Sequence, residues 1–579
     1  MNDHFAAPGP RTVRAASTPT QSRPAVVPAR YKWLALSNTT VGVLLATIDS
    51  SIMLIAMPAI FRGIHLDPLE PGNTFYLLWM ILGFQVVSSV LVVSLGRLGD
   101  IFGRVRMYTL GFAIYTGSSL LLTLDPFTGQ SAAVWLIVGR LFQGAGAAFL
   151  VGNSSAILTD AFPPTQRGLA LGINNVAGIS GSFIGLILGG ILAAIHWRLI
   201  FLVSVPFGLF GTLWSYFKLK ELGDRNRAKI DWAGNITFAA GLILVMIGIT
   251  FGIEPANGRT MGWSSAPVIS LLAAGTVSLV AFALIETRVA EPMFRLTLFK
   301  IKAFTFGTLS TFLSAIGRGG LMFMLIIWLQ GIWLPLHGYS FEQTPLWAGI
   351  FMLPLTAGFL IAGPAFGYLS DRFGARYFAT GGMIGAAVSF VLLLVLPIDF
   401  NYAAFAAIML LNGICMGAFA APNRAAVMNS LPAGDRGAGG GMNATFQNSA
   451  QVLSIGIFFT LMITGLSMTL SSTLTQRLMQ HGVPAAVARH VGALPPVSVL
   501  FAAFLGYNPI ESLVGPGVLH QLPVADRSEL TGPFFFPNLI SGPFHAGLTE
   551  AFIFAALVCL IAAAASWSRG ERYVHEEAE

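Results

Sequence analysis

The stretch that decides the fold is residues 96–106, which read GRLGDIFGRVR. It lies between two hydrophobic runs, each long enough to cross a membrane. A second, degraded copy, GYLSDRFGAR, occupies residues 367–376. The glycines allow two helices to meet across a tight turn, the aspartate can accept hydrogen bonds from an arginine, and the arginines favour the cytoplasmic side of a membrane. The repetition predicts two related halves, each with this loop after its second helix.

The composition indicates a polytopic α-helical membrane protein. The chain has 579 residues, of which 55% are hydrophobic and only 10% are charged, and its mean hydropathy is +0.74. Soluble domains carry about 25% charged residues, and the apolar runs are too long and unbroken for a β-barrel. Sixty-four glycines suit closely packed membrane helices. The net charge of +7 does not indicate nucleic acid, and Cys415 and Cys559 fall inside apolar runs, so a disulfide framework is not expected.

The apolar runs predict fourteen membrane spans with both termini in the cytoplasm of a multi-pass cell-membrane protein. Most lysines and arginines fall on the side that this arrangement makes cytoplasmic, including both copies of the loop. The predicted spans are approximately 34–60, 74–95, 108–124, 134–158, 168–194, 198–218, 232–253, 265–286, 303–331, 346–369, 377–397, 402–428, 438–466 and 547–568.

The spacing of the two loops predicts the domain order. They start 271 residues apart (367 − 96), which leaves room for two extra helices between two six-helix halves. We expect a disordered cytoplasmic tail at 1–32, a six-helix bundle at 33–219, a basic linker with two inserted helices at 220–300, a second six-helix bundle at 301–568, and a cytoplasmic tail at 569–579. Within the second bundle, residues 467–546 form a long external loop, whose apolar content predicts a partly ordered cap or a tolerated insertion.

The loop motif resembles the conserved loop between the second and third helices of the major facilitator superfamily. The resemblance implies two six-helix bundles that alternate access to a central site, and it gives the loops the role of a latch that holds and releases one conformation. A simpler interpretation is a turn that fixes topology. The residues concerned are Gly96, Asp100, Gly103, Arg104, Arg106, Gly367, Asp371, Arg372 and Gly374.

Two charged residues inside spans carry a closer resemblance, to the fourteen-helix drug:proton antiporters. Asp49 lies in ATIDSSIMLIAMP and Arg140 in LIVGRLFQGAGAAF, which are similar to the first-helix and fourth-helix motifs of that group. At 1.5 Å per residue, Asp49 lies about 20 Å from the cytoplasmic end of its span, and Arg140 about 9 Å below the outer end of its own. The Arg140 side chain can therefore reach Asp49 if the helices are neighbours. The resemblance implies a proton-coupling pair; the alternative is a static salt bridge.

The fifth span carries a row of glycines, of which the first four, Gly178, Gly181, Gly185 and Gly189, share one helix face. The row resembles the antiporter motif of the same family, except that Leu186 stands where the family has proline. The alternative is plain close packing of helices. The motif glycines are Gly181, Gly185, Gly189 and Gly190, with Gly178 one turn earlier.

Other polar residues are candidates for a substrate cavity. Arg318 lies near the middle of its span, and the second half has no mid-span carboxylate to pair with it. It could pair across the cavity or meet an anionic substrate group. Arg424 lies near a cytoplasmic end and is expected to reach toward the membrane surface. Asn443, Gln447 and Gln451 are spaced to share a face, which could line the cavity or bond between helices. Further candidates by position are Trp79, Gln143, Asn174, Asn175 and Phe446.

These patterns predict a secondary transporter rather than an enzyme. No catalytic constellation, phosphate-binding loop or metal-ligand cluster occurs, so no cofactor is expected and the proton gradient would supply the energy. The resemblance implies export of amphipathic small molecules, with protons and the bilayer as the other partners. Two alternatives stay open: export or flipping of a lipid or cell-envelope precursor, and a non-transporting sensor or assembly partner that acts through residues 467–546 by binding a lipid or an external protein.

Overall fold

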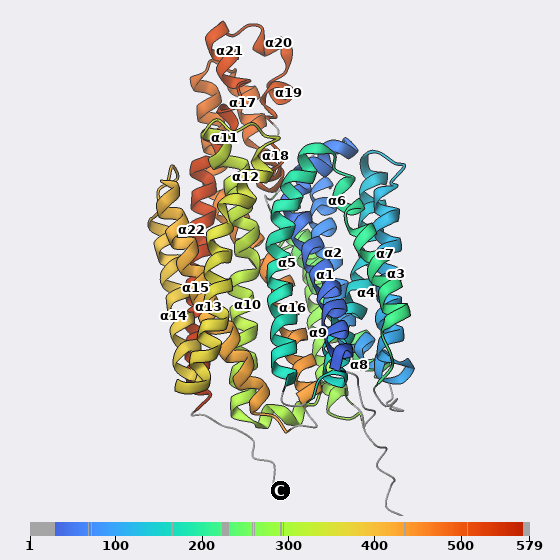
Figure 1. Cartoon of the computed structure of the whole chain (residues 1–579). Coiled ribbons are helices and arrows are strands. Elements are labelled where there is room, and N and C mark those ends of the chain that lie inside the picture. The colour runs from blue at the N-terminus through green and yellow to red at the C-terminus, as the bar shows by residue number, and fades with distance from the viewer. Residues whose placement is uncertain are drawn as a thin grey trace, which may run out of the picture.

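The computed structural model describes residues 29–67, 69–70, 72–163, 166–222, 231–256, 259, 261–289, 292, 294–432, 436–506 and 508–570. The described part is helical, with one isolated bridge and no strand. Most of the predicted tails and of the predicted basic linker lies outside the described residues. The helices form a bundle with a cap standing on one end (Figure 1). We call that end the cap end, and the opposite end, which carries residues 96–106 and 367–376, the loop end.

The two halves repeat one packing pattern. In the first half α1 packs on α5 and α2 on α4, and in the second half α10 packs on α16 and α13 on α15. The first half consists of α1 (Ala29–Ile64), α2 (Asn73–Phe102), α3 (Arg104–Thr123), α4 (Gly129–Ala161), α5 (Arg167–Ile195), α6 (Leu199–Leu202) and α7 (Ser204–Lys218). The second consists of α10 (Lys302–Trp328), η3 (Leu329–Trp333), α11 (Leu334–Leu336), α12 (Thr344–Phe351), α13 (Leu353–Phe373), α14 (Ala375–Val395), α15 (Tyr402–Asn429), α16 (Arg436–Gln480) and α22 (Phe535–Ser568).

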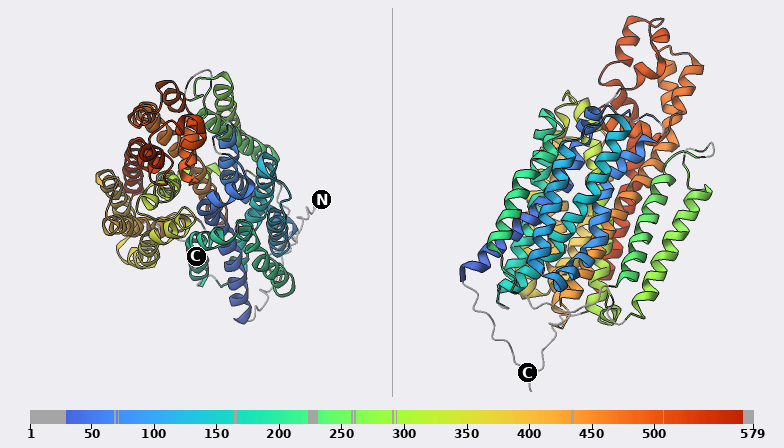
Figure 2. Two further views of the ribbon diagram at one scale, coloured as in Figure 1. Left: turned by 90° about the horizontal axis from the view of Figure 1, so that it is seen from above. Right: turned by 90° about the vertical axis from the view of Figure 1, so that its right-hand side faces the viewer.

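Two inserted helices lie against the seam between the halves. They are α8 (Trp232–Gly252) and α9 (Ala266–Glu286), and the short η2 (Leu296–Lys300) follows them. The two pack on each other, and α8 also contacts α2 and α16 (Figure 2). The Asp231 side chain accepts from Gly234 N at 2.8 Å and so caps α8, which satisfies one of the free N–H groups of the first turn.

The cap is helical and continuous with the second half. Helix α16 runs on to Gln480 and α22 begins at Phe535, so both extend well beyond the predicted spans 438–466 and 547–568. Between them lie α17 (Ala485–Gly492), α18 (Pro496–Phe504), α19 (Ile510–Val514), α20 (Pro516–Leu519) and α21 (Val524–Leu530). Every residue of α18 is buried, because the helix inserts between α2, α16, α22 and η3.

The predicted all-α fold with many membrane-spanning helices is confirmed, whereas the side of the membrane on which the termini lie stays a prediction. Thirteen helices of the described chain are long and apolar enough to cross a membrane. The fourteenth predicted span is α3, a 20-residue helix that packs on α4 and α7 within the bundle but is less apolar than the other spans. Helix α1 begins and α22 ends at the loop end (Figures 1 and 2).

Candidate functional site

A large cavity lies between the two halves. Its volume is about 2260 Å³, and its walls come from α1, α2, α4 and α5 on one side and α10, α13, α15 and α16 on the other. Asp100, Arg167 and Lys300 line it near helix ends at the loop end. The cavity therefore opens at the loop end.

The cap end of the cavity is closed by direct contact between the halves. An ideal Cβ on Gly190 of α5 would lie only 2.4 Å from Leu346 Cα of α12. Gln330 Nε2 of η3 donates to Ile55 O of α1 at 3.3 Å. Leu186, which replaces the family's proline, is 1% exposed and its carbonyl abuts Gly349. The structure is thus open at one end and sealed at the other.

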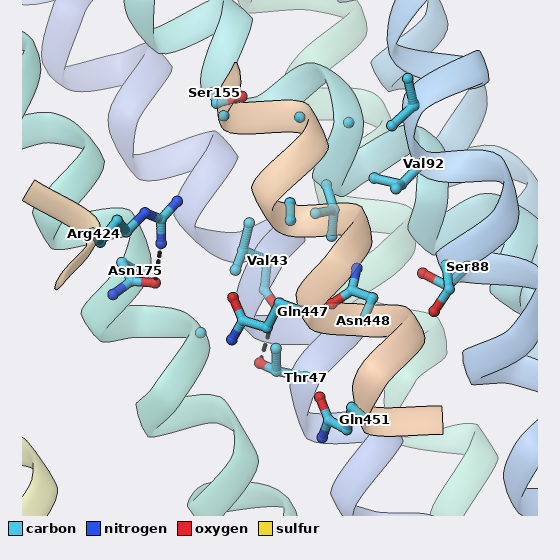
Figure 3. A pocket seen from close by; sticks show the side chains of 18 of the residues that line it. Val43, Thr47, Ser88, Val92, Ser155, Asn175, Arg424, Gln447, Asn448 and Gln451 are labelled. Carbon is cyan, nitrogen blue, oxygen red and sulfur yellow. Dashed lines mark hydrogen bonds between the residues drawn. The ribbon is translucent and has the colours of Figure 1, made fainter. Parts of the chain in front are cut away.

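Five of the residues predicted for the cavity do line it. They are Asn174, Asn175, Arg318, Gln447 and Gln451. Figure 3 shows Asn175, Gln447 and Gln451 at the wall together with residues that the sequence did not single out: Thr47, Ser88 and Asn448. These small polar residues are common in membrane helices, and only the packing of α1, α2 and α16 around one space selects them.

Four of the predicted cavity residues lie elsewhere. Trp79 is 8% exposed and packs beside Phe75, with ring centroids 5.9 Å apart. Gln143 and Asn443 are buried away from the cavity wall. Phe446 belongs to an aromatic cluster, and its ring centroid lies 5.4 Å from that of Phe294, in the segment that leads into the second half. Assigning these four to the cavity was wrong, because neighbouring helices cover them.

Asp49 and Arg140 meet in a closed polar cluster. Arg140 Nη1 donates to Asp49 Oδ2, and both side chains are at most 1% exposed. Gln143 Nε2 donates to Asp49 Oδ1 at 3.1 Å, and Gln143 Oε1 accepts from Arg140 Nη1 at 2.7 Å. Arg140 Nε also donates to Met80 O at 3.3 Å, and its guanidinium lies 4.5 Å from the ring centroid of Phe84.

This cluster lies behind the cavity wall rather than in it. Ser50, Ser51 and Phe84 line the cavity, whereas Asp49, Arg140 and Gln143 do not. The pair links α1 to α4 and is held in place through contacts on both partners. Such a pair can respond to a proton without touching a bound molecule.

The sequence predicted that Arg424 reaches toward the membrane surface, and this prediction was wrong. Arg424 lines the cavity, and its Nη1 donates to Asn175 Oδ1 at 2.7 Å (Figure 3). The bond joins α15 of the second half to α5 of the first. Arg424 therefore contributes both to the cavity wall and to the contact between the halves.

The first glycine–aspartate loop forms a charge network at the loop end. Arg104 Nη2 lies 2.8 Å from Asp100 Oδ1, and Arg104 Nη1 lies 2.5 Å from Asp160 Oδ1 at the end of α4. Gly103 has φ +111° and no room for a Cβ beside Glu221, so this turn requires glycine. Arg106 contributes its backbone N–H, which donates to Glu221 Oε1 at 2.8 Å, rather than its side chain.

The second copy keeps the turn with fewer charge contacts. Gly374 has φ +90° and separates α13 from α14. Gly367 packs near Ala421, and the Arg372 guanidinium lies 5.4 Å from the ring centroid of Phe373. The side chain of Asp371 lies outside what the structure describes.

The glycine row of α5 brings two helix backbones together. An ideal Cβ on Gly181 would lie 2.9 Å from Leu44 O, one on Gly185 2.4 Å from Ile48 O, and one on Gly189 3.0 Å from Ile52 O. All three contacts are with α1, the helix that carries Asp49, and Gly178 faces the same helix. Close packing is therefore what the row achieves here, and it holds Asp49 at a fixed height.

Two buried acids at the mouth of the cavity had not been singled out in the sequence. Glu286 is 3% exposed and accepts from Phe294 N at 2.8 Å, and Asp231 is 6% exposed. An ideal Cβ on Gly234 would lie 2.2 Å from Asp231 Oδ2 and 2.9 Å from Glu286 Oε1. The acids thus anchor the ends of the inserted helices beside the mouth, which Glu286 lines.

Known proteins resemble this chain in sequence over most of its length. The riboflavin transporter RibZ of Clostridioides difficile is 27% identical over 431 residues, which cover 74% of this chain and 88% of that protein. The tetracenomycin C resistance and export protein of Streptomyces glaucescens is 26% identical over 476 residues, covering 81% and 84%. The multidrug resistance protein Stp of Mycobacterium tuberculosis is 28% identical over 470 residues, covering 80% and 81%.

Solved structures share the fold. The crystal structure of a bacterial homolog of the human lysosomal transporter Spinster, inward-facing and unoccupied, matches with a TM-score of 0.53 at 15% identity, covering 94% of this chain and 99% of that one. The sequence profile of the Major Facilitator Superfamily matches residues 39–455. With its repeated halves, its glycine–aspartate loops and its central cavity, the chain belongs to the major facilitator superfamily of membrane transporters.

Proposed function

We propose that the protein is a proton-coupled exporter of amphipathic small molecules that works by alternating access. The observation that carries the proposal is the fully buried Asp49–Arg140 pair directly behind the wall of a cavity open at one end. Export and resistance proteins among the relatives support the direction of transport. The riboflavin transporter among them leaves uptake as an outcome of the test.

We assign the loop end to the cytoplasm, because arginine-rich loops favour that side of a membrane. The conformation is then inward-open, ready to load a molecule from the cytoplasm or the inner leaflet. Both termini lie on the cytoplasmic side in this orientation.

Protonation of Asp49 removes its attraction for Arg140. The freed guanidinium keeps Gln143 and Met80 O as partners, so α1 and α4 can shift without leaving the arginine bare. When the carrier changes conformation, the cap-end contacts of α1 and α5 with η3 and α12 would open and the loop end would close. The Asp100–Arg104–Asp160 network, which is intact while the loop end is open, would loosen at that step. Protons that enter from outside would bind Asp49 while the cap end is open and would return the empty carrier to the conformation open at the loop end.

The test uses purified protein in proteoliposomes with a trapped pH-sensitive dye. A pH gradient is imposed, and a panel of amphipathic cations, anions and neutral compounds is added. We expect at least one compound to trigger proton movement in wild type and none to do so in Asp49→Asn. The matched control is Asp399→Asn, which removes an exposed loop carboxylate. Proton movement that persists at wild-type rate in folded Asp49→Asn would refute the coupling role.

A second candidate, export or flipping of a lipid or envelope precursor, is favoured by one contact of the cap. Phe504 of the buried helix α18 lies 5.8 Å from Phe323, measured between ring centroids, and Phe323 lines the cavity. The cap thus touches the transport path and could receive an apolar chain there. Dye-labelled lipid that crosses the bilayer only in vesicles containing the protein would favour this candidate over soluble compounds.

A further inference from the structure

The cavity has a polar belt at mid-depth with a single charge in it. The belt residues lie roughly 20–30 Å along their helices from the loop end, at 1.5 Å per residue. Those that matter here are Thr47, Gln85, Ser88, Asn412, Gln451 and Arg318. Arg318 is the one charged side chain among the described residues that line the cavity at this depth.

Arg318 has no partner for its charge in the part of the chain that the structure describes. Among the described residues it makes no hydrogen bond or ion pair. Its neighbour Gly319 packs against Gln451 of α16, with an ideal Cβ 2.9 Å from Gln451 O, so the backbone at Arg318 is fixed against the adjacent helix of the same half. Asp49 is not available to it, because Arg140 already binds that carboxylate outside the cavity.

The mouth of the cavity adds charge of the same sign. Arg97, Arg167, Arg295, Lys300 and Arg424 line it nearer the loop end, against the acids Asp100 and Glu286. Arg104 also lines it but is occupied by two carboxylates. A cavity lined by one dominant sign of charge concentrates ions of the opposite sign.

The wall next to the belt is apolar. Phe84, Leu54, Met322, Phe323 and Phe359 line it around and above the level of Arg318. An unpaired guanidinium beside neutral amides and hydroxyls, with an aromatic wall next to it, can bind a molecule with an anionic group at one end and an apolar body at the other.

We propose that the transported molecule is an amphipathic anion whose carboxylate, sulfonate or phosphate binds Arg318. The inference rests on the proposed function, since it names the charge class of that substrate. Gln451 and Ser88 donate to the remaining oxygens of the anionic group, and the apolar body lies along Phe84 and Phe359.

Binding to the purified protein in phosphatidylcholine nanodiscs tests this directly. The probes are naphthalene-2-sulfonate, its neutral sulfonamide and a naphthyl trimethylammonium cation, which share one apolar body. We expect the sulfonate to bind about ten- to a hundredfold more tightly than the sulfonamide, the range for hydrogen bonds to a charged group. We expect that ratio to fall to about one in Arg318→Gln and to recover in part in Arg318→Lys.

The matched control is Arg259→Gln, which removes an exposed arginine far from the cavity and should leave the ratio unchanged. Equal binding of the three probes by wild type, or an undiminished ratio in Arg318→Gln, would overturn the proposal. A folded but globally weakened variant is recognised because it loses sulfonamide binding as well.

The anionic group could belong to a soluble molecule or to a lipid. Replacing part of the nanodisc lipid with phosphatidylglycerol separates the two sources: displacement of the sulfonate in wild type identifies a lipid headgroup, and no displacement identifies a soluble anion. Proton movement is measured separately. Anion-selective binding without proton movement would refute the coupling and leave this inference standing, whereas proton movement triggered by cations alone would refute this inference and leave the coupling standing.

Discussion

Removing the charge of Asp49 should destabilise the protein, and removing the charge of Arg140 as well should restore much of the loss. Asp49→Asn leaves a guanidinium that is 1% exposed without a counter-charge. Breaking a buried ion pair by removing one partner costs about 3–5 kcal/mol. Arg140 keeps hydrogen bonds of 2.7 Å to Gln143 and 3.3 Å to Met80 O, and it keeps the ring face of Phe84. We therefore expect the lower end of the range, about 3 kcal/mol.

The double variant Asp49→Asn/Arg140→Gln contains no uncompensated charge. Its free energy of unfolding should exceed the value that adding the two single losses predicts, with a coupling of about 2–3 kcal/mol, near the top of the range for residues in contact. Arg140→Gln alone should cost less at low pH than at neutral pH, because the stranded Asp49 can then take up a proton. The double variant also gives the transport assay a stable protein that lacks the proton site.

Unfolding by sodium dodecyl sulfate in mixed micelles, followed by tryptophan fluorescence, measures all four proteins of the cycle. Size-exclusion profiles establish that each starts as a monodisperse species. If the two single losses simply add, or if Asp49→Asn is as stable as wild type, then the pair is not an interacting buried salt bridge and the coupling mechanism loses its basis.

Three further predictions concern other parts of the molecule. Gly185→Val should lower the free energy of unfolding by about 1–3 kcal/mol in the same assay, because a Cβ would meet the α1 backbone. The control is Gly172→Val, at a glycine with open space around it, which should cost less than half as much. Asp160→Asn removes one of the two carboxylates that contact Arg104. It should shift the population toward the conformation open at the cap end by less than about tenfold, since the pair is partly exposed. Spin-label distances across the loop end measure this shift, and an unchanged distance distribution would argue against a latch. Phe504→Ala should destabilise the cap by about 3–5 kcal/mol, seen as faster proteolysis of residues 481–534 in intact vesicles; cleavage at the wild-type rate would show that α18 does not hold the cap.

The sequence predicted what depends on regular repeats. Hydrophobic runs located the helices, and the repeated loops located the two halves. The pairing of Asp49 with Arg140 followed from the helical rise combined with the family resemblance. These features depend on the lengths of the hydrophobic runs, on the repeated loop motif and on the rise per residue of a helix, which tertiary packing does not alter.

Rotation about each helix axis was harder to predict. Asn443 and Gln451 are eight residues apart, and at 100° per residue they differ by about 80° in direction. That angle places Gln451 in the cavity and Asn443 outside its wall. Phe446 packs against Phe294 and Phe299, from a connecting segment whose path no periodicity describes. Arg424 lies in the cavity because Asn175, on a helix 249 positions away, is there to accept its hydrogen bond.

The uninterrupted run of α16 turns the cap into a lever arm. The helix is 45 residues long, about 68 Å at 1.5 Å per residue. It carries the polar-belt residue Gln451 about a third of the way along, and its far end carries the cap. A rotation of the second half by ~10° would move the cap-end tip by roughly 8 Å, since the tip lies ~44 Å from Gln451. Each transport cycle would thus move the cap, outside the membrane, farther than it moves the helix segments around the cavity. An antibody fragment bound to the tip would slow the transport cycle by restricting this movement. Two dyes, one at the tip and one on α7, would allow the duration of the cycle to be measured in single molecules.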